Sequence, residues 1–270
     1  ALGEKPALLS RMADDDSGRM MRAALQKRGV DDRFVFSDPD TGTSTCIVLI
    51  KENAQRSFLT FKGCLRNFGD GDIDYTCGQQ ARLVSIGGLF PLPTFDRSAS
   101  SRLLQAAKDA GCITVVDTKY DAFHIGLQGI GNLLEYTDYF FPSYDEAAAL
   151  SGLTEPAQIA RFFRSRGAKH VGVKLGADGC YVCSNAFCGT VAPFCTSVLD
   201  TTGAGDNFMA GLIHGVLRGW TIQDCVTFAN AAGALACSRL GATSDLDYLQ
   251  PIRNILSQTE AGTRLVKEGI

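Results

Sequence analysis

Short apolar runs alternate with amphipathic segments through the middle of the chain. The apolar runs predict strands at residues 84–89, 113–117, 139–141 and 170–174. Between them, apolar positions at helical spacing predict helices at residues 99–110, 145–150 and 154–166. This order predicts an α/β protein with three layers, in which a mostly parallel central sheet carries helices on both faces.

A second pattern lies nearer the start of the chain. Residues 43–50 and 56–61 alternate between apolar and polar positions, which predicts a hairpin at roughly 43–61. The pattern leaves two placements open, a small β lid or an edge hairpin of the main sheet. Because no repeat, low-complexity tract or linker interrupts residues 1–270, we expect one domain.

Candidate chemistry gathers where the predicted strands end. Gly87, Asp117, Ser143, Lys174 and Asp206 all fall at or just after a strand end. Ligands of open parallel sheets bind beyond the carboxyl ends of the strands. We therefore expect these five residues to share one cleft.

The string DTTGAGD at residues 200–206 is the most informative stretch. Phe208, Leu212 and Val216 follow it at helical spacing, so the string marks the point where a loop becomes a helix. Free N–H groups at a helix start stabilise an anion, and glycine lets a phosphate approach the backbone closely.

The same string supplies an acid beside those amides. Gly203, Ala204 and Gly205 can form an anion hole, and Asp206 can accept a proton from an attacking hydroxyl as general base. A Gly-x-Gly-Asp sequence alone is also typical of a tight loop followed by an ordinary acid at a helix start. The longer string, with two threonines and an acid at each end, is more specific.

This string resembles the signature of the ribokinase-like (PfkB) carbohydrate kinase family. Other segments resemble the family in the same order, up to about Asp245. They are the early strand and acidic turn (1–18), an Asn-x-x-Glu region (141–147), a strand and turn (171–179), and a helix and loop (230–242).

The resemblance implies a ribokinase-like fold with a small β lid and ATP-dependent phosphorylation of a hydroxyl on a sugar or sugar-like molecule. It places Lys174, Gly176, Gly179, Asn230 and Gly233 along the nucleotide, together with Ser143 and Glu146. It also implies magnesium and, at a second loop, a monovalent cation such as potassium. The positions that match the cation site are Asp200, Thr202, Ala236, Arg239, Gly241 and Asp245.

The chain departs from the family pattern in two places. Ser143 replaces the usual asparagine, which weakens its expected role at the phosphate, while Glu146 is retained to order water around magnesium. The alternative for Glu146 is a solvated acid at a helix start. The family's first strand and its Gly-Gly-x-x-x-Asn segment have no counterpart, so we hypothesise an N-terminal piece, including part of the lid, that precedes Ala1. Residues 117–120 are a candidate for contacts near the phosphate or the sugar, although for Lys119 we favour a solvated loop cation.

Composition and charge limit the kinds of partner and the cell compartment that we expect for this protein. With 45% hydrophobic and 20% charged residues, a net charge of −3 and a pI near 5.6, the chain has no broad attraction for nucleic acid or anionic membranes. Without an apolar run for a bilayer or an export signal, we expect a cytoplasmic protein whose ten cysteines are free thiols. Cys180 and Cys183 have the spacing of half a zinc site, but we expect buried strand residues.

Other functions remain to be weighed against a sugar kinase. A nucleoside kinase of the same family and a nucleotide-binding relative without catalysis both stay open. A dinucleotide-binding oxidoreductase is disfavoured because Phe208 stands where a third glycine is needed, and the P-loop pattern is absent. A homodimer formed through the lid is a further expectation of the resemblance.

Overall fold

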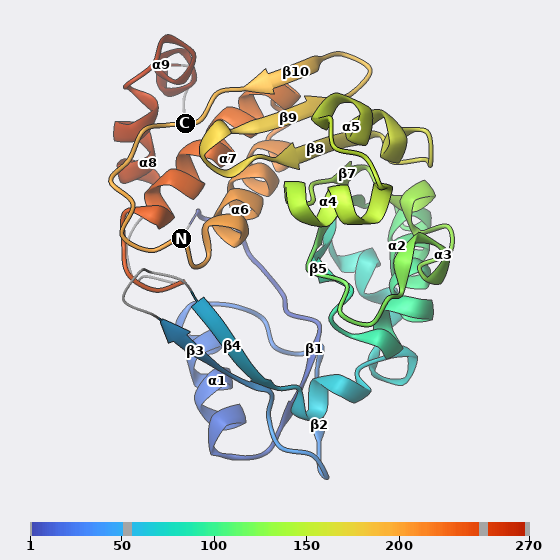
Figure 1. Cartoon of the computed structure of the whole chain (residues 1–270). Helices are drawn as coiled ribbons and strands as arrows, with labels where there is room; N and C mark the ends of the chain where they lie inside the picture. The colour runs from blue at the N-terminus through green and yellow to red at the C-terminus, as the bar shows by residue number, and fades with distance from the viewer. Residues whose placement is uncertain (1, 51–55, 243–247, 268–270) are drawn as a thin grey trace.

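A six-stranded sheet forms the centre of the computed structural model, which describes residues 2–50, 56–242 and 248–267 (Figure 1). Its strand order is β10-β9-β8-β7-β6-β5. The strands are β5 (Leu83–Leu89), β6 (Ile113–Thr118), β7 (Tyr139–Phe140), β8 (His170–Lys174), β9 (Cys180–Cys183) and β10 (Cys188–Val191). Strands β5 to β8 are parallel and the last two are antiparallel, so the predicted mostly parallel sheet is confirmed.

Helices cover both faces of this sheet, which confirms the three-layer prediction (Figure 1). One face carries α2 (Ser100–Asp109), α3 (Gly126–Gly129), α4 (Tyr144–Ser151) and α5 (Pro156–Arg164). The other carries α6 (Ala204–Leu217) and α7 (Ile222–Cys237), with α8 (Leu249–Leu256) and α9 (Glu260–Lys267) packed against α7. No helix in the described residues is long and apolar enough to cross a membrane.

Successive side chains of a strand point to opposite faces of the sheet, so those of one strand pack into two separate cores. On β6, Val116 packs in the cluster that contains Leu104 and Phe163, whereas Val115 packs in the cluster that contains Leu212. Since both faces are buried, the strand reads as an unbroken apolar run.

Two small sheets stand apart from the large one. Parallel strands β1 (Ser10–Ala13) and β2 (Val35–Asp38) flank α1 (Asp16–Lys27), and the antiparallel pair is β3 (Thr45–Ile50) with β4 (Arg56–Phe61). The predicted hairpin therefore forms a sheet of its own, and its placement at the edge of the main sheet is wrong. In Figure 1 both small sheets lie on the same side of the large sheet.

The acidic turn before α1 joins these small sheets. Asp15 accepts hydrogen bonds from the backbone N–H of Gly18 and from both the N–H and the hydroxyl of Thr43, at 2.7 to 2.8 Å. These hydrogen bonds, chiefly those from Thr43, lower the pKa of Asp15 to about 2. The acid therefore fixes the entry of the β3–β4 hairpin against α1.

The cysteines correct one expectation. Cys183 and Cys188 stand opposite each other on β9 and β10 and form a disulfide, so the prediction that every thiol is free is wrong for this pair. Cys180 is a buried free thiol on β9, as expected for a strand residue. Among the described residues no three histidine, cysteine or acidic side chains gather to hold a metal. The bond at Cys183 also removes one ligand of the half zinc site.

Candidate active site

The site is built around the first turn of α6. Gly203 caps the helix with φ of +80°, a left-handed conformation that favours glycine, and a Cβ there would come within 2.7 Å of the Ala242 carbonyl oxygen. Asp206 lies in the first turn of the helix, and its side chain is 62% exposed. The predicted transition from loop to helix is confirmed, and it presents an acid beside the amides of the helix start, of which the Ala204 N–H donates to the Thr201 carbonyl at 3.2 Å.

Two neighbouring loops meet beside this turn. Asp200 accepts hydrogen bonds from the N–H and hydroxyl of Thr202, at 2.8 and 2.7 Å, and from the N–H of Gly241, at 3.0 Å. The carbonyl of Ala236 accepts from the N–H of Arg239. Asp200, Thr202 and Gly241 are thus brought together, Ala236 and Arg239 contact each other at the end of α7, and Asp245 lies outside the described residues.

Lys174 ends β8 and reaches under the same turn. Its Nζ lies 2.6 Å from Asp117 Oδ1, and a Cβ on Gly205 would come 3.6 Å from that Nζ. Burial raises the pKa of Asp117, and the ammonium of Lys174 acts in the opposite direction. The lysine predicted along the nucleotide therefore places a paired, mostly buried positive charge behind Gly205.

Ser143 and Glu146 begin α4 at the end of β7. Glu146 Oε2 accepts from the backbone N–H of Ser143 at 3.1 Å and from the hydroxyl of Thr118 at 2.7 Å. The carboxylate thus closes the helix start and ties α4 to the end of β6. It is not the solvated acid that the alternative interpretation described.

Three further residues predicted along the nucleotide lie near one another in the fold. Gly176 and Gly179 belong to the turn between β8 and β9, and Asn230 contacts the end of β10. Gly176 and Gly179 both have positive φ, and a Cβ on Gly179 would come within 2.3 Å of the Val191 carbonyl oxygen. Asn230 is buried and donates its amide to the carbonyls of Val191 and Ala192. The side chain of Asn230 therefore holds the end of β10 in place, and its position along the nucleotide stays a prediction.

Gly233 serves the packing of two helices. A Cβ there would come 3.4 Å from the Ala204 carbonyl oxygen, so α7 approaches the first turn of α6 closely at this position. The same pair of helices meets again where Gly211 faces Ala229. Gly233 thus lies behind the first turn of α6.

Lys119 is the residue for which the sequence favoured a solvated loop cation over a contact near the phosphate or the sugar. Its side chain is 48% exposed, and its Nζ also lies 3.5 Å from Asp206 Oδ1, so it pairs with the acid at the start of α6. The available signal was its position two residues after Asp117 at the end of β6, beside the other strand-end residues. The contact joins the end of β6 to the first turn of α6, which are far apart in sequence, so only the folded structure shows it.

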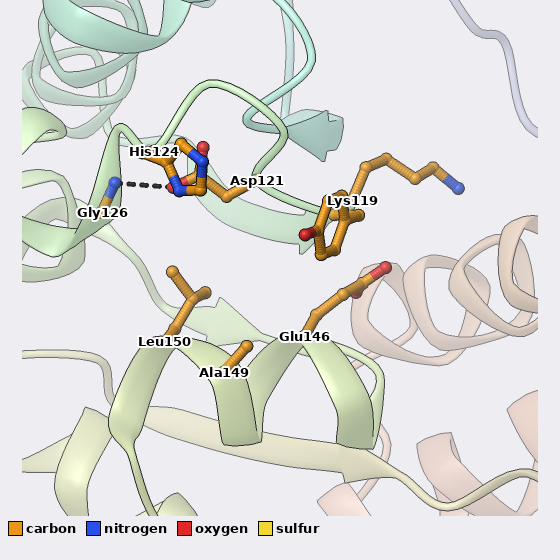
Figure 2. Close-up of a pocket in the computed structure, with 8 residues that line it drawn as sticks. Lys119, Asp121, His124, Gly126, Glu146, Ala149 and Leu150 are labelled. Carbon is orange, nitrogen blue, oxygen red and sulfur yellow. Dashed lines mark hydrogen bonds between the residues drawn. The ribbon is translucent and has the colours of Figure 1, made fainter.

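A pocket of about 300 Å³ adjoins these charged groups (Figure 2). It lies between the segment after β6 and α4. Its described lining is Lys119, Tyr120, Asp121, His124, Gly126, Glu146, Ala149 and Leu150. In Figure 2 the charged ends of Lys119 and Glu146 both turn away from His124 and Leu150. Lys119 and Glu146 therefore carry charge at one end of the pocket, while Asp121 and His124 lie together at the other (Figure 2).

An exposed carboxylate, free helix-start amides and flanking lysines at the strand ends suit an enzyme that transfers phosphoryl groups. The comparison with protein families is consistent with that class. The pfkB family carbohydrate kinase model matches residues 1–248, and the chain belongs to this family. Its members are ATP-dependent phosphotransferases, and this protein is an ATP-dependent carbohydrate kinase.

Individual relatives share this assignment at low identity. An uncharacterized sugar kinase of Archaeoglobus fulgidus is 26% identical over 245 residues, covering 91% of this chain and 96% of the relative. Fructokinase-2 of Oryza sativa subsp. japonica is 25% identical, covering 95% and 81%.

Solved structures share the ribokinase-like fold. An E. coli protein provisionally assigned as ribokinase II, in complex with ATP and Mg²⁺, has a TM-score of 0.84 at 24% identity, over 96% of this chain and 85% of that one. Arabidopsis thaliana ribokinase complexed with ribose and ATP has a TM-score of 0.72 at 26% identity, covering 88% and 77%. The predicted fold class is thus confirmed.

Proposed function

We propose that this kinase transfers the γ-phosphoryl group of ATP to a hydroxyl of a sugar or sugar-like acceptor, with Asp206 as general base. The observation that carries the proposal is the exposed carboxylate of Asp206. It lies in the first turn of α6, the helix that Gly203 caps. The N–H groups of Gly203 and Gly205 would hold the phosphoryl oxygens as negative charge shifts onto them, and that of Ala204 would join them by leaving the Thr201 carbonyl.

The residues present fit a nucleotide and magnesium. Among the described residues, a Cβ on Gly205 would meet only the Nζ of Lys174, so the backbone is open to a phosphate on that side. Glu146 uses Oε2 for its two hydrogen bonds, and Oε1 would face water around magnesium. Bound magnesium supplies charge neutralisation at the phosphates.

The two loops joined by Asp200 are a candidate potassium site. Backbone carbonyls and a carboxylate are the ligands that a hard cation prefers. Asp200, Thr202 and Gly241 already form one hydrogen-bonded unit, so a cation there would stiffen the loop before Gly203. A rise in turnover with potassium, but not with the much larger tetramethylammonium, would support this site.

The names of the relatives suggest the first acceptors to test. Fructose and ribose are the sugars of the fructokinases and ribokinases that this chain resembles. A nucleoside acceptor is the second candidate, because adenosine kinase from Sinorhizobium meliloti shares the fold with a TM-score of 0.80 at 23% identity. A shared fold does not choose between them.

The direct test is ADP release with Mg-ATP across sugars and nucleosides, beside Asp206→Asn. The variant keeps the shape and removes the base, so turnover should fall at least about 100-fold while ATP binding is kept. Turnover near that of the unaltered protein would contradict the role of Asp206. ATP binding without turnover on any acceptor would instead indicate a relative without catalysis.

A further inference from the structure

Lys119 is held in place by the ends of two strands. Its backbone N–H donates to the Leu89 carbonyl at 2.9 Å. Its side-chain stem lies against Gly88, where a Cβ would come within 3.0 Å of Lys119 Cγ. The end of β5 therefore leaves room for this stem and directs the ammonium toward Asp206, 3.5 Å away.

Two lysine–acid pairs flank the first turn of α6, and they differ in exposure. The side chains of Lys174 and Asp117 are 13% and 2% exposed, whereas those of Lys119 and Asp206 are 48% and 62% exposed. A buried pair is costly to separate, while a pair that water reaches can exchange partners at small cost. Lys119 is therefore the lysine that can move to an arriving anion.

The position of Lys119 also fits the path of a transferred phosphoryl group. Lys119 and Glu146 line the same pocket and turn their charged ends in the same direction (Figure 2). Asp206, the proposed base, lies 3.5 Å from the ammonium and marks the end where the acceptor hydroxyl must sit. The ammonium thus lies next to the base and lines the same pocket as the acid on the metal side.

We propose that Lys119 is a catalytic residue whose ammonium leaves Asp206 when nucleotide binds and contacts the γ-phosphoryl oxygens during transfer. This inference rests on the proposed function. The acceptor oxygen forms a bond to the γ-phosphorus, and the bond from that phosphorus to the bridging oxygen breaks. The electron pair stays on ADP, and the hydroxyl proton goes to Asp206.

Lys119 forms no covalent bond in this step. Its positive charge offsets the negative charge that spreads over the equatorial oxygens in the transition state. Its departure also frees the Asp206 carboxylate to accept the hydroxyl proton. Without nucleotide, the ion pair gives each of the two groups a partner.

The test compares Lys119→Met with Lys119→Arg and with Lys169→Met. Lys169 is a matched control because it is also an exposed lysine in an ion pair, with Asp138, but lies before the opposite end of β8. For the acceptor found with Mg-ATP, kcat should fall about 100- to 1,000-fold in Lys119→Met, as for loss of one transition-state donor, with acceptor KM little changed. Lys119→Arg should keep more activity, and Lys169→Met should match the unaltered protein.

Binding gives a second measure that does not depend on turnover. The affinity for ADP with aluminium fluoride and acceptor, which imitate the transferring group, should fall in Lys119→Met by a factor similar to that of kcat. The affinity for ADP alone should stay the same, and thermal unfolding should show that the variant folds.

Three results would overturn the inference. Turnover of Lys119→Met within threefold of the unaltered protein, while Asp206→Asn is inactive, would refute Lys119 and leave the proposed function standing. A raised acceptor KM with unchanged kcat would mean that Lys119 binds the acceptor instead. No turnover of the unaltered protein on any acceptor would remove the proposed function and this inference with it.

Discussion

Gly203 and Gly205 stand two residues apart, yet a side chain would meet different surroundings at each. At Gly203 the backbone has φ of +80°, and a Cβ would press on the Ala242 carbonyl. At Gly205 the backbone is helical, and the nearest atom to a Cβ is the Lys174 Nζ at an ordinary 3.6 Å. The first glycine is therefore required by the fold, and the second only by what binds there.

A pair of alanine variants separates these two requirements. Gly203→Ala should lose about 1–2 kcal/mol of unfolding free energy, the cost of a left-handed conformation at a residue with a Cβ. Gly205→Ala should keep or slightly gain stability, because alanine favours a helix, but its methyl group should weaken ATP binding. Urea unfolding and ATP titration measure both. Equal stability of the two variants would contradict this distinction.

Single residues of the site differ in how far the sequence could predict them. Asp206 and Gly203 were predictable because a local string decides both the helix start and the position of the acid. The ion pairs of Lys119 and Lys174 were not, because each joins segments that only the folded sheet brings together. The hydrogen-bond partners of Asn230 were not predictable for the same reason, since they lie at the end of β10.

At the scale of elements, the local pattern of apolar residues predicted the strands that are buried on both faces and the helices that are buried on one face. The apolar runs predicted β5 to β8 within one residue at each end, and the amphipathic segments predicted α2, α4 and α5. The hairpin was also predicted, but its separation from the main sheet was not, because alternation does not show which strand a strand pairs with. The disulfide of Cys183 and Cys188 depends on the same missing knowledge of register.

The β3–β4 hairpin has an exposed apolar face. Cross-strand register puts Ile47 beside Leu59, and Leu49 and Phe61 share that face of β3 and β4. These four side chains are between 48% and 59% exposed. Exposed apolar patches of this kind mark interaction sites, so we propose that the hairpin joins two copies of this chain.

Charge placed on this face tests the dimer. Leu59→Lys should convert a dimer into a monomer, because a lysine would be buried without a partner in the contact. Thr60→Lys is the matched control, since the adjacent residue of β4 points to the opposite face. Sedimentation at several protein concentrations measures both. A monomeric unaltered protein, or a dimer that survives Leu59→Lys, would refute the proposal.

At the scale of the whole molecule, two buried titratable groups make the unfolding free energy depend on pH in opposite directions. Asp96 is fully buried and accepts from the Leu92 N–H, and burial raises its pKa from 3.8 to about 6. His214 is buried between Trp220 and Phe228, and burial is the largest cause that lowers its pKa from 6.5 to about 4. Neither group belongs to the proposed site, so both concern the stability of the fold.

The signs of these two contributions are opposite in the same pH window. The folded protein holds the Asp96 proton more tightly than the unfolded chain, so that contribution is present below about pH 4 and lost as pH rises through 6. The contribution of neutral His214 is present above about pH 6.5 and lost as pH falls through 4. Each of these pKa changes, from 3.8 to about 6 and from 6.5 to about 4, corresponds to at most about 3 kcal/mol of unfolding free energy.

Asp96→Asn should separate the two contributions. Relative to the unaltered protein, the variant should gain unfolding free energy as pH rises from about 4 to 6.5, by up to about 3 kcal/mol, and then level off. His214→Phe, which keeps an aromatic ring in the cluster, should gain relative stability in the opposite direction, as pH falls over the same range. Urea unfolding at several pH values measures both differences. If the Asp96→Asn difference does not change with pH, the buried carboxyl is not protonated in the folded protein, and the curve of His214→Phe alone must then account for any pH dependence in this window.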